Sequence, residues 1–179
     1  MLLRKVKCIF VNANKPNKDG KYGMCVLIPK SDKTALAAIQ KEVKEALESK
    51  FGTESWDKRR RFKLPIRDAS DSLDGYDDYM LFNANSSNEP GILNSRKQEP
   101  SNDEIRSCCF SGAEFHITVN FYPFEGDTAK GVACGLNNIM LIDGGGDGDR
   151  VGGRPDAKSD FADIEVDDSD DEIDDFDDI

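Results

Sequence analysis

The sequence of 179 residues predicts a mainly β protein whose strands form a small barrel, closed or partly open. Two observations carry this expectation. Five short apolar segments have the character of strands, and only one segment has the periodicity of an amphipathic helix. A parallel sheet would need a helix after most strands, and long polar insertions stand where those helices would be. A five-stranded barrel with one helix therefore fits the pattern best.

The first two strands are expected at residues 6–11 and 22–28. Both are apolar and contain several β-branched or aromatic residues, which favour extended structure. The polar stretch between them contains the turn pair Asp19-Gly20, and Pro29 ends the second segment. An Asp-Gly turn between two short strands indicates a hairpin or an adjacent strand pair.

The single amphipathic helix is expected over residues 33–50. Apolar side chains recur there at steps of three and four, namely Leu36, Ile39, Val43, Ala46 and Leu47. Ser31 or Asp32 can accept hydrogen bonds from the first turn, and Gly52 follows the last turn, where a left-handed residue is tolerated. Lysine and glutamate occupy the remaining face, so this helix covers a core with one side only.

The remaining strands are expected at residues 79–85, 115–122 and 131–142, after polar insertions at 53–75 and 86–103. Alternation along the fourth strand separates an apolar face from a face that carries His116, Thr118, Asn120 and Tyr122. The strand phenylalanines expected in the core on this ground are Phe82, Phe115 and Phe121. Tyr79 and Tyr122 remain open to either a core or a surface role.

The formal net charge of -11 divides unevenly along the chain. Residues 1–67 hold 17 basic and 7 acidic residues, a net +10; residues 68–154 carry -9 and residues 155–179 carry -12. We therefore expect one folded domain over residues 1–154 and an acidic tail over 155–179. The tail has too little apolar surface to offset ordering of its backbone, which predicts disorder when it is alone.

Several classes of function are disfavoured by the residues that are present. The only histidine, His116, lies in a strand, and the five cysteines lack paired metal-ligand spacing. No phosphate-binding glycine loop occurs. We expect no catalytic residue, no cofactor, no metal and no membrane span, with buried thiols in a reducing, intracellular compartment. An enzyme, such as a nuclease, ranks behind a binding protein.

The basic N-terminal third favours a nucleic acid ligand. Lys58 to Lys63 form a dense cationic run that also contains Phe62, and Trp56 lies just before it. Single-stranded nucleic acid requires this combination, because cations follow the phosphates while flat rings stack on the bases. A solvated basic loop without a ligand is the competing interpretation for residues 59–61.

The tail carries a second, separate signal. Large apolar residues stand at intervals among its acids, above all Phe176 and Ile179. This spacing favours recognition by a partner with a basic rim and an apolar pocket over simple solubilisation. On a flexible tether, the same acids could also occupy a basic groove when nucleic acid is absent.

Five short motifs occur in an order that resembles phage-encoded single-stranded DNA-binding proteins with an OB-fold core. They are YGMCVLIPKSD at 22–32, KLPIRD at 63–68, FNAN at 82–85, VNFYPF at 119–124 and KGVA with LNN within 130–138. The acidic tail with a near-terminal phenylalanine is similar as well, although Phe176 is followed by three more residues and Ile179 is an alternative anchor. The resemblance covers residue 5 to about residue 154, and the tail.

The resemblance implies a protein that coats single-stranded DNA without strong sequence preference during phage replication and recombination. It further implies a homodimer in the cytoplasm of an infected bacterial host, whose tail contacts the replicative DNA polymerase and helicase. A protein-interaction module, with the tail as the main functional element and nucleic-acid binding incidental, is the alternative.

Candidate DNA contacts follow from the cations and aromatic residues at strand and motif edges. For phosphates we expect Lys30, Arg67 and Lys130, and Lys63 is expected as a further DNA contact. For base stacking we expect Tyr79 and Tyr122. For a mobile clamp we expect Trp56, Arg59, Arg60 and Arg61.

Overall fold

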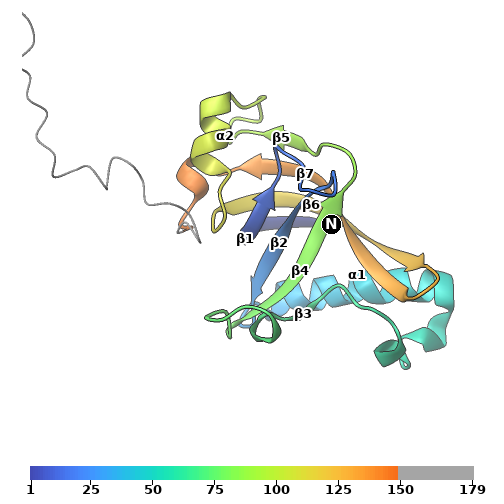
Figure 1. Cartoon of the computed structure of the whole chain (residues 1–179). Coiled ribbons are helices and arrows are strands. Elements are labelled where there is room, and N and C mark those ends of the chain that lie inside the picture. The colour runs from blue at the N-terminus through green and yellow to red at the C-terminus, as the bar shows by residue number, and fades with distance from the viewer. Residues whose placement is uncertain (149–179) are drawn as a thin grey trace, which may run out of the picture.

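The computed structural model describes residues 1–148, which form a barrel with one long helix across an end (Figure 1). The barrel strands are β1 (Leu2–Asn12), β2 (Tyr22–Pro29), β4 (Tyr79–Ser86), β6 (Glu114–Glu125) and β7 (Lys130–Leu141). The short strands β3 (Arg67–Asp68) and β5 (Gly91–Leu93) extend the sheet at its edges. The helices are α1 (Lys33–Phe51) and α2 (Asn102–Cys108), with 3-10 turns at Thr53–Ser55, Arg59–Arg61, Ala69–Asp71 and Asp143–Gly145.

The barrel closes through a short parallel seam. Antiparallel pairing joins β4 to β2, β2 to β1, β1 to β6 and β6 to β7. Strands β4 and β7 then meet in parallel at only two residue pairs, Ala84 with Cys134 and Asn85 with Gly135. This closed five-stranded barrel confirms the expected OB-fold. All five predicted strands are present within a few residues of their expected bounds.

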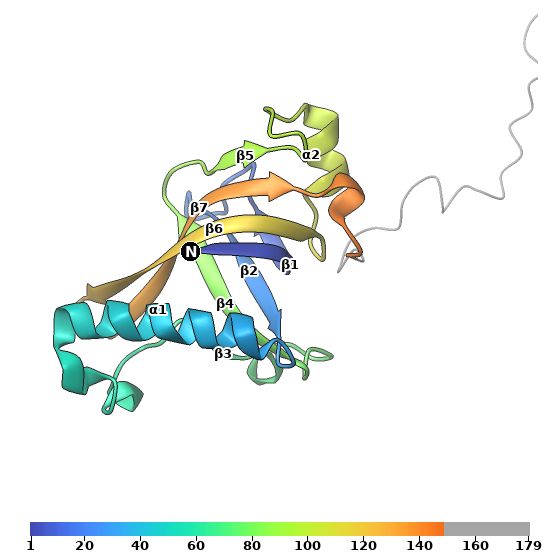
Figure 2. The ribbon, with the colours of Figure 1, turned by 180° about the vertical axis from the view of Figure 1, so that it is seen from behind.

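The core lies inside the barrel and beneath α1. Alternate strand residues point inward, so that Val26, Phe82 and Phe115 are fully buried, as predicted for the two phenylalanines. Helix α1 adds its apolar stripe of Ile39, Val43 and Leu47, and it contacts β6 and β7 (Figure 2).

Both predicted ends of α1 are confirmed. The Asp32 carboxylate accepts a hydrogen bond from the backbone N–H of Ala35 at 2.9 Å. Gly52 follows the last turn with a φ of 85°, which suits glycine.

A second apolar cluster lies on the outside of β1, β2 and β4. Ile9, Cys25, Leu27, Ala69 and Leu81 form its buried part. Leu73, Tyr76 and Tyr79 pack on that part from the connection between β3 and β4 and from the start of β4. The connection between β3 and β4 therefore covers part of this outer sheet face.

The polar insertion predicted at residues 86–103 contains more structure than its composition indicates. It holds β5, and α2 begins in it at Asn102. The side chain of Ser101 accepts from the backbone N–H of Glu104, while the Glu104 carboxylate accepts from that of Ser101. This reciprocal capping box fixes the start of a helix too short to show periodicity.

The expected burial of the thiols is found for four of the five cysteines. All five cysteines are free of disulfide bonds, four are buried and Cys109 is half-buried. Burial raises the pKa of Cys109 to about 11 and that of Cys134 to about 12. Over residues 1–148 no helix is long and apolar enough to cross a bilayer. The predicted boundary at residue 154 and the acidic tail lie outside the described residues.

Candidate nucleic-acid interface

The basic run lies on a segment that crosses the barrel seam. This basic segment, residues 58–68, passes from β7 to β4. Lys63 donates its backbone N–H to the Lys130 carbonyl and accepts from the N–H of Val132, both at 2.9 Å. Four residues later Arg67 pairs with Leu81 of β4. Backbone hydrogen bonds therefore hold the segment on both sides of the seam.

Gly131 makes this close approach possible. A Cβ atom at position 131 would overlap the backbone carbonyl of Lys63. Any side chain there would push the basic segment away from β7. The glycine of the KGVA motif is thus explained by the contact that positions Lys63.

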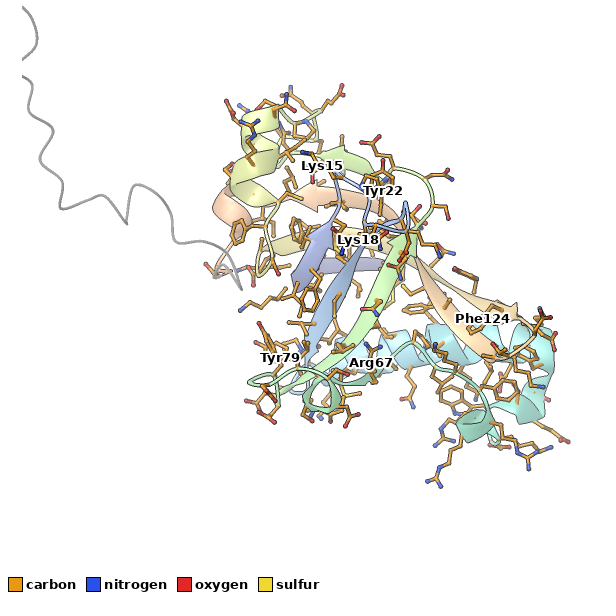
Figure 3. The ribbon with its side chains drawn as sticks, viewed as in Figure 1. Lys15, Lys18, Tyr22, Arg67, Tyr79 and Phe124 are labelled. Atoms are coloured by element: carbon orange, nitrogen blue, oxygen red, sulfur yellow. The ribbon has the colours of Figure 1, made fainter. Side chains whose placement is uncertain are left out.

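A cavity of about 370 Å³, the basic groove, lies between this segment and strands β4, β6 and β7. Its lining residues are Lys21, Lys63, Leu64, Pro65, Arg67, Asn83, Asn85, Tyr122, Phe124, Val132, Ala133 and Cys134. Three of them are cations and none is acidic, so the lining carries +3. None of the three cations forms a salt bridge within residues 1–148. Figure 3 shows Arg67 beside the lower half of β4 and Phe124 on the projecting β6–β7 hairpin.

A second cavity of about 310 Å³, the neutral hollow, lies at the far end of β2. Its lining residues are Arg4, Lys5, Val6, Lys7, Leu27, Ile28, Pro29, Asp32, Tyr79, Glu114 and Asp147. Its three cations face three acids, and Lys5 forms salt bridges to Asp147 at 2.7 Å and to Glu114 at 3.7 Å. The lining charge is therefore zero.

A third cavity, the amide hollow, adjoins the basic groove. Its volume is about 240 Å³ and its lining residues are Phe10, Asn12, Asn17, Gly23, Met24, Cys25, Asn83 and Asn85. It has no charged side chain. Asn83 and Asn85 of β4 belong to both linings, so the two cavities adjoin at these side chains, and together they make up a depression on the sheet.

Three of the predicted contact residues meet in the basic groove. Lys63 and Arg67 approach it from the basic segment, and Tyr122 approaches from β6. Tyr122 is 44% exposed, whereas its neighbour Phe121 turns inward, with its ring centroid 5.7 Å from that of Phe82. Strand alternation therefore separates the available ring from the core ring.

Lys30 and Tyr79 lie away from the basic groove. The Lys30 ammonium forms a salt bridge with Asp68 at 2.7 Å and donates to the Asp77 carbonyl at 2.6 Å. Its hydrogen bond is the main cause that lowers the pKa of Asp68 to about 2. Tyr79 packs edge-on against Tyr76 at 5.9 Å and lines the neutral hollow.

The predicted clamp residues lie on the other side of the basic segment. Trp56 and Arg59 line a hollow of about 260 Å³ beside α1, which shares only Leu64 with the basic groove. The Arg59 guanidinium lies 5.3 Å from the Trp56 ring centroid. Arg60 and Arg61 are exposed in the adjacent 3-10 turn. The structure thus separates these residues from Tyr122.

Lys130 caps a pair of aromatic rings at the β6–β7 hairpin. Its ammonium lies 5.8 Å from the Phe51 ring centroid and 5.5 Å from that of Phe62. The two rings are themselves 4.9 Å apart. The cation remains exposed, and these cation–π contacts favour its position over the two rings.

Several lining residues were not predicted from the sequence. Asn83 and Asn85 lie in the FNAN motif, and alternation opposite the buried Phe82 and Ala84 would have placed both on the outer face. Lys21 lies directly before the second expected strand, and Phe124 is the last residue of the VNFYPF motif. The β1–β2 loop also carries two exposed lysines, Lys15 and Lys18, which line none of the three cavities (Figure 3).

The depression therefore combines unpaired cations, amides and aromatic rings. Cations attract phosphates, amides can donate to or accept from any base, and rings stack on bases. Within residues 1–148 no cluster of three metal-ligating side chains occurs.

Comparison with known proteins agrees with this chemistry. The family model of the Enterobacter phage Enc34 ssDNA-binding protein matches residues 3–173. The solved structure of the single-stranded DNA-binding protein from bacteriophage Enc34 has a TM-score of 0.67 at 21% identity, covering 90% of this chain and 89% of that chain. The structure of that protein in complex with ssDNA gives 0.67 at 20% identity, covering 84% and 88%.

A more distant structure has the same fold. Gp2.5, a single-stranded DNA-binding protein encoded by bacteriophage T7, has a TM-score of 0.58 at 16% identity, covering 94% of this chain and 96% of that chain. At such identities these structures establish the shared fold. Curated protein sequences give no match. Because the family model spans nearly the whole chain, the chain belongs to the phage single-stranded DNA-binding family of Enc34, a family of binding proteins and not of enzymes.

Proposed function

We propose that this protein coats single-stranded DNA without sequence preference during phage DNA replication and recombination, and that the strand lies in the basic groove. The observation that carries the proposal is the lining of that groove, with three unpaired cations, no acid and the exposed ring of Tyr122. The DNA complex of the Enc34 relative supports it.

The lack of sequence preference follows from the groups that line the groove. Phosphate contacts carry no sequence information, and every base has a face on which a ring can stack. The amides of Asn83 and Asn85 can donate to some bases and accept from others. The groove offers no fixed pattern of donors that would select one base.

Fluorescence anisotropy with a labelled 30-nucleotide oligo(dT) tests the proposal. We expect saturable binding that weakens linearly on a log–log plot as salt rises, with a slope of about -0.7 for each phosphate neutralised. A mixed-sequence strand should bind within a few-fold of oligo(dT), and duplex DNA much more weakly. Binding that is absent near micromolar protein, with or without residues 155–179, would refute the function. Degradation of the strand with magnesium would instead favour an enzyme.

The acidic tail supplies the second part of the proposal. Residues 155–179 recruit the replicative DNA polymerase and helicase, with Phe176 as anchor and Ile179 as the alternative. The support is the placement of large apolar residues among the acids. Phe176→Ala and Ile179→Ala, compared by polymerase and helicase pull-down, identify the anchor. DNA affinity should stay unchanged in both variants, and loss of DNA binding and capture together would contradict this division.

The same proposal places the protein as a homodimer in the cytoplasm of the infected host cell. Light scattering coupled to size exclusion measures the oligomeric state directly. If the tail competes with DNA for the basic groove, removal of residues 155–179 should also tighten DNA binding, most strongly at low salt.

A further inference from the structure

Phe10 occupies an irregular position in β1. The pairing of β1 with β2 shifts register between Ile9 and Asn12, so Phe10 lies in a β-bulge. Its φ of 51° falls in the left-handed region, which is unusual for a bulky residue. Two side chains hold the bulge: Ser111 Oγ accepts from the Phe10 N–H at 3.0 Å, and Asn12 Nδ2 donates to the Phe10 carbonyl at 3.1 Å.

The bulge directs the Phe10 ring into solvent. The two residues before it, Cys8 and Ile9, are fully buried, whereas Phe10 is 62% exposed. Within residues 1–148 only four large apolar side chains are exposed, and two of these are aromatic, Phe10 and Tyr122. Strained backbone that presents an apolar ring to water is a feature typical of functional sites.

Phe10 and Tyr122 lie at opposite ends of one depression. Phe10 lines the amide hollow and Tyr122 lines the basic groove, and the two cavities share Asn83 and Asn85. The intervening strands are β2, β4 and β7. With about 4.8 Å between neighbouring strands, four spacings give a path of roughly 19 Å.

The two ends differ in charge. Three cations line the cavity that holds Tyr122, whereas the hollow beside Phe10 is lined by four asparagines and by no charged residue. Uncharged amides and an apolar ring suit a base better than a phosphate.

We propose that Phe10 is a second base-stacking platform, so that the single strand continues from the basic groove across β4 and β2 to β1. This inference rests on the proposed function. It adds a contact at the end of the depression that holds no cation. The bulge fixes the Phe10 backbone before DNA arrives, which lowers the ordering cost of the contact.

Phe10→Ala and Phe10→Leu test the proposal, with Leu2→Ala as matched control. Leu2 is 48% exposed on the same strand and lines none of the three cavities of the sheet face. Loss of one stacked base should weaken 30-nucleotide oligo(dT) binding about 5- to 150-fold in both Phe10 variants, and less than 2-fold in the control. Because leucine keeps the apolar bulk, an equal loss in both variants assigns the effect to the ring.

Phe10→Trp gives a direct readout. A base stacked on the new tryptophan should quench its fluorescence. The wild type, whose only tryptophan is Trp56, gives the reference signal. An abasic strand of equal length should not quench the new tryptophan. Phe10→Ala within 2-fold of wild type, or equal quenching by the abasic strand, would overturn the stacking role. A wild-type protein that binds no single strand would instead overturn the proposed function, so the two failures are distinguishable.

Discussion

The basic groove and the neutral hollow have similar volumes and the same number of lining cations, but they differ in net lining charge. Each is a cavity of about 300 to 400 Å³ that is lined by three cations and one tyrosine. In the neutral hollow, Asp32, Glu114 and Asp147 cancel the charge. In the basic groove no acid is present, and the field of its cations extends to the solvent.

The difference shows why a count of cations along the sequence does not locate a nucleic-acid interface. Lys5 and Lys63 have the same side chain and both are exposed on the barrel surface. Two carboxylates hold Lys5, whereas no salt bridge within the described residues holds Lys63. The neighbours supplied by the fold decide which cations remain available for phosphates.

The largest expected effect comes from removing the cations of the basic groove. Lys63→Ala combined with Arg67→Ala should weaken oligo(dT) binding about 100-fold or more, at about 1.5 to 3 kcal/mol for each charge-assisted contact. The salt slope should also fall by about 1.4, for two phosphates released. The matched control, Arg4→Ala with Lys7→Ala in the neutral hollow, should change affinity only slightly. Equal losses of DNA affinity in both double variants would contradict the assignment of DNA binding to the basic groove.

Substitution of the two tyrosines should have smaller effects, and only one of the two should lower DNA affinity. Tyr122→Ala should cost about 1 to 3 kcal/mol of DNA affinity through a lost stacked base. Tyr79→Ala should leave affinity nearly unchanged but lower the free energy of unfolding by about 2 to 4 kcal/mol, because its ring packs on Tyr76 and the outer cluster. Anisotropy and urea unfolding measure the two effects. The reverse pattern would mean that DNA follows the neutral hollow.

The smallest effect concerns Lys30, whose charge is already paired. Lys30→Ala should raise the pKa of Asp68 from about 2 toward its ordinary 3.8, followed by NMR titration of the carboxyl group. Because folding lowers this pKa, the pair contributes stability above pH 3.8 that is lost as pH falls toward 2. DNA affinity should change little. A loss comparable to that of the Lys63 and Arg67 variant would show that a paired lysine still contacts phosphate.

Much of the fold was predictable because its signals are local. The five barrel strands alternate or are continuously apolar, and α1 has a full amphipathic repeat with both ends marked. Strand β5 and helix α2 lie in a polar stretch and are too short to show a period. Their structure depends on β7 and on a capping box.

The site was predictable only in part for a related reason. Lys63, Arg67 and Tyr122 could be recognised from motif position and alternation. The pairing of Lys30 with Asp68 joins residues far apart in sequence, and strand alternation does not distinguish Tyr79 from Tyr122. Phe10 was not predicted as a site residue, because a β-bulge interrupts the strand alternation on which such a prediction depends.

The seam of the barrel gives the groove a further property. Strands β4 and β7 pair at only two positions, and the basic segment bridges them on either side through Lys63 and Arg67. A DNA single strand bound to both Lys63 and Arg67 would favour the closed β4–β7 seam over any form in which β4 and β7 separate. DNA would then act as a ligand of barrel closure, and occupancy and closure would be thermodynamically linked. Gly131, which touches no DNA in this scheme, would contribute to affinity by permitting that closure.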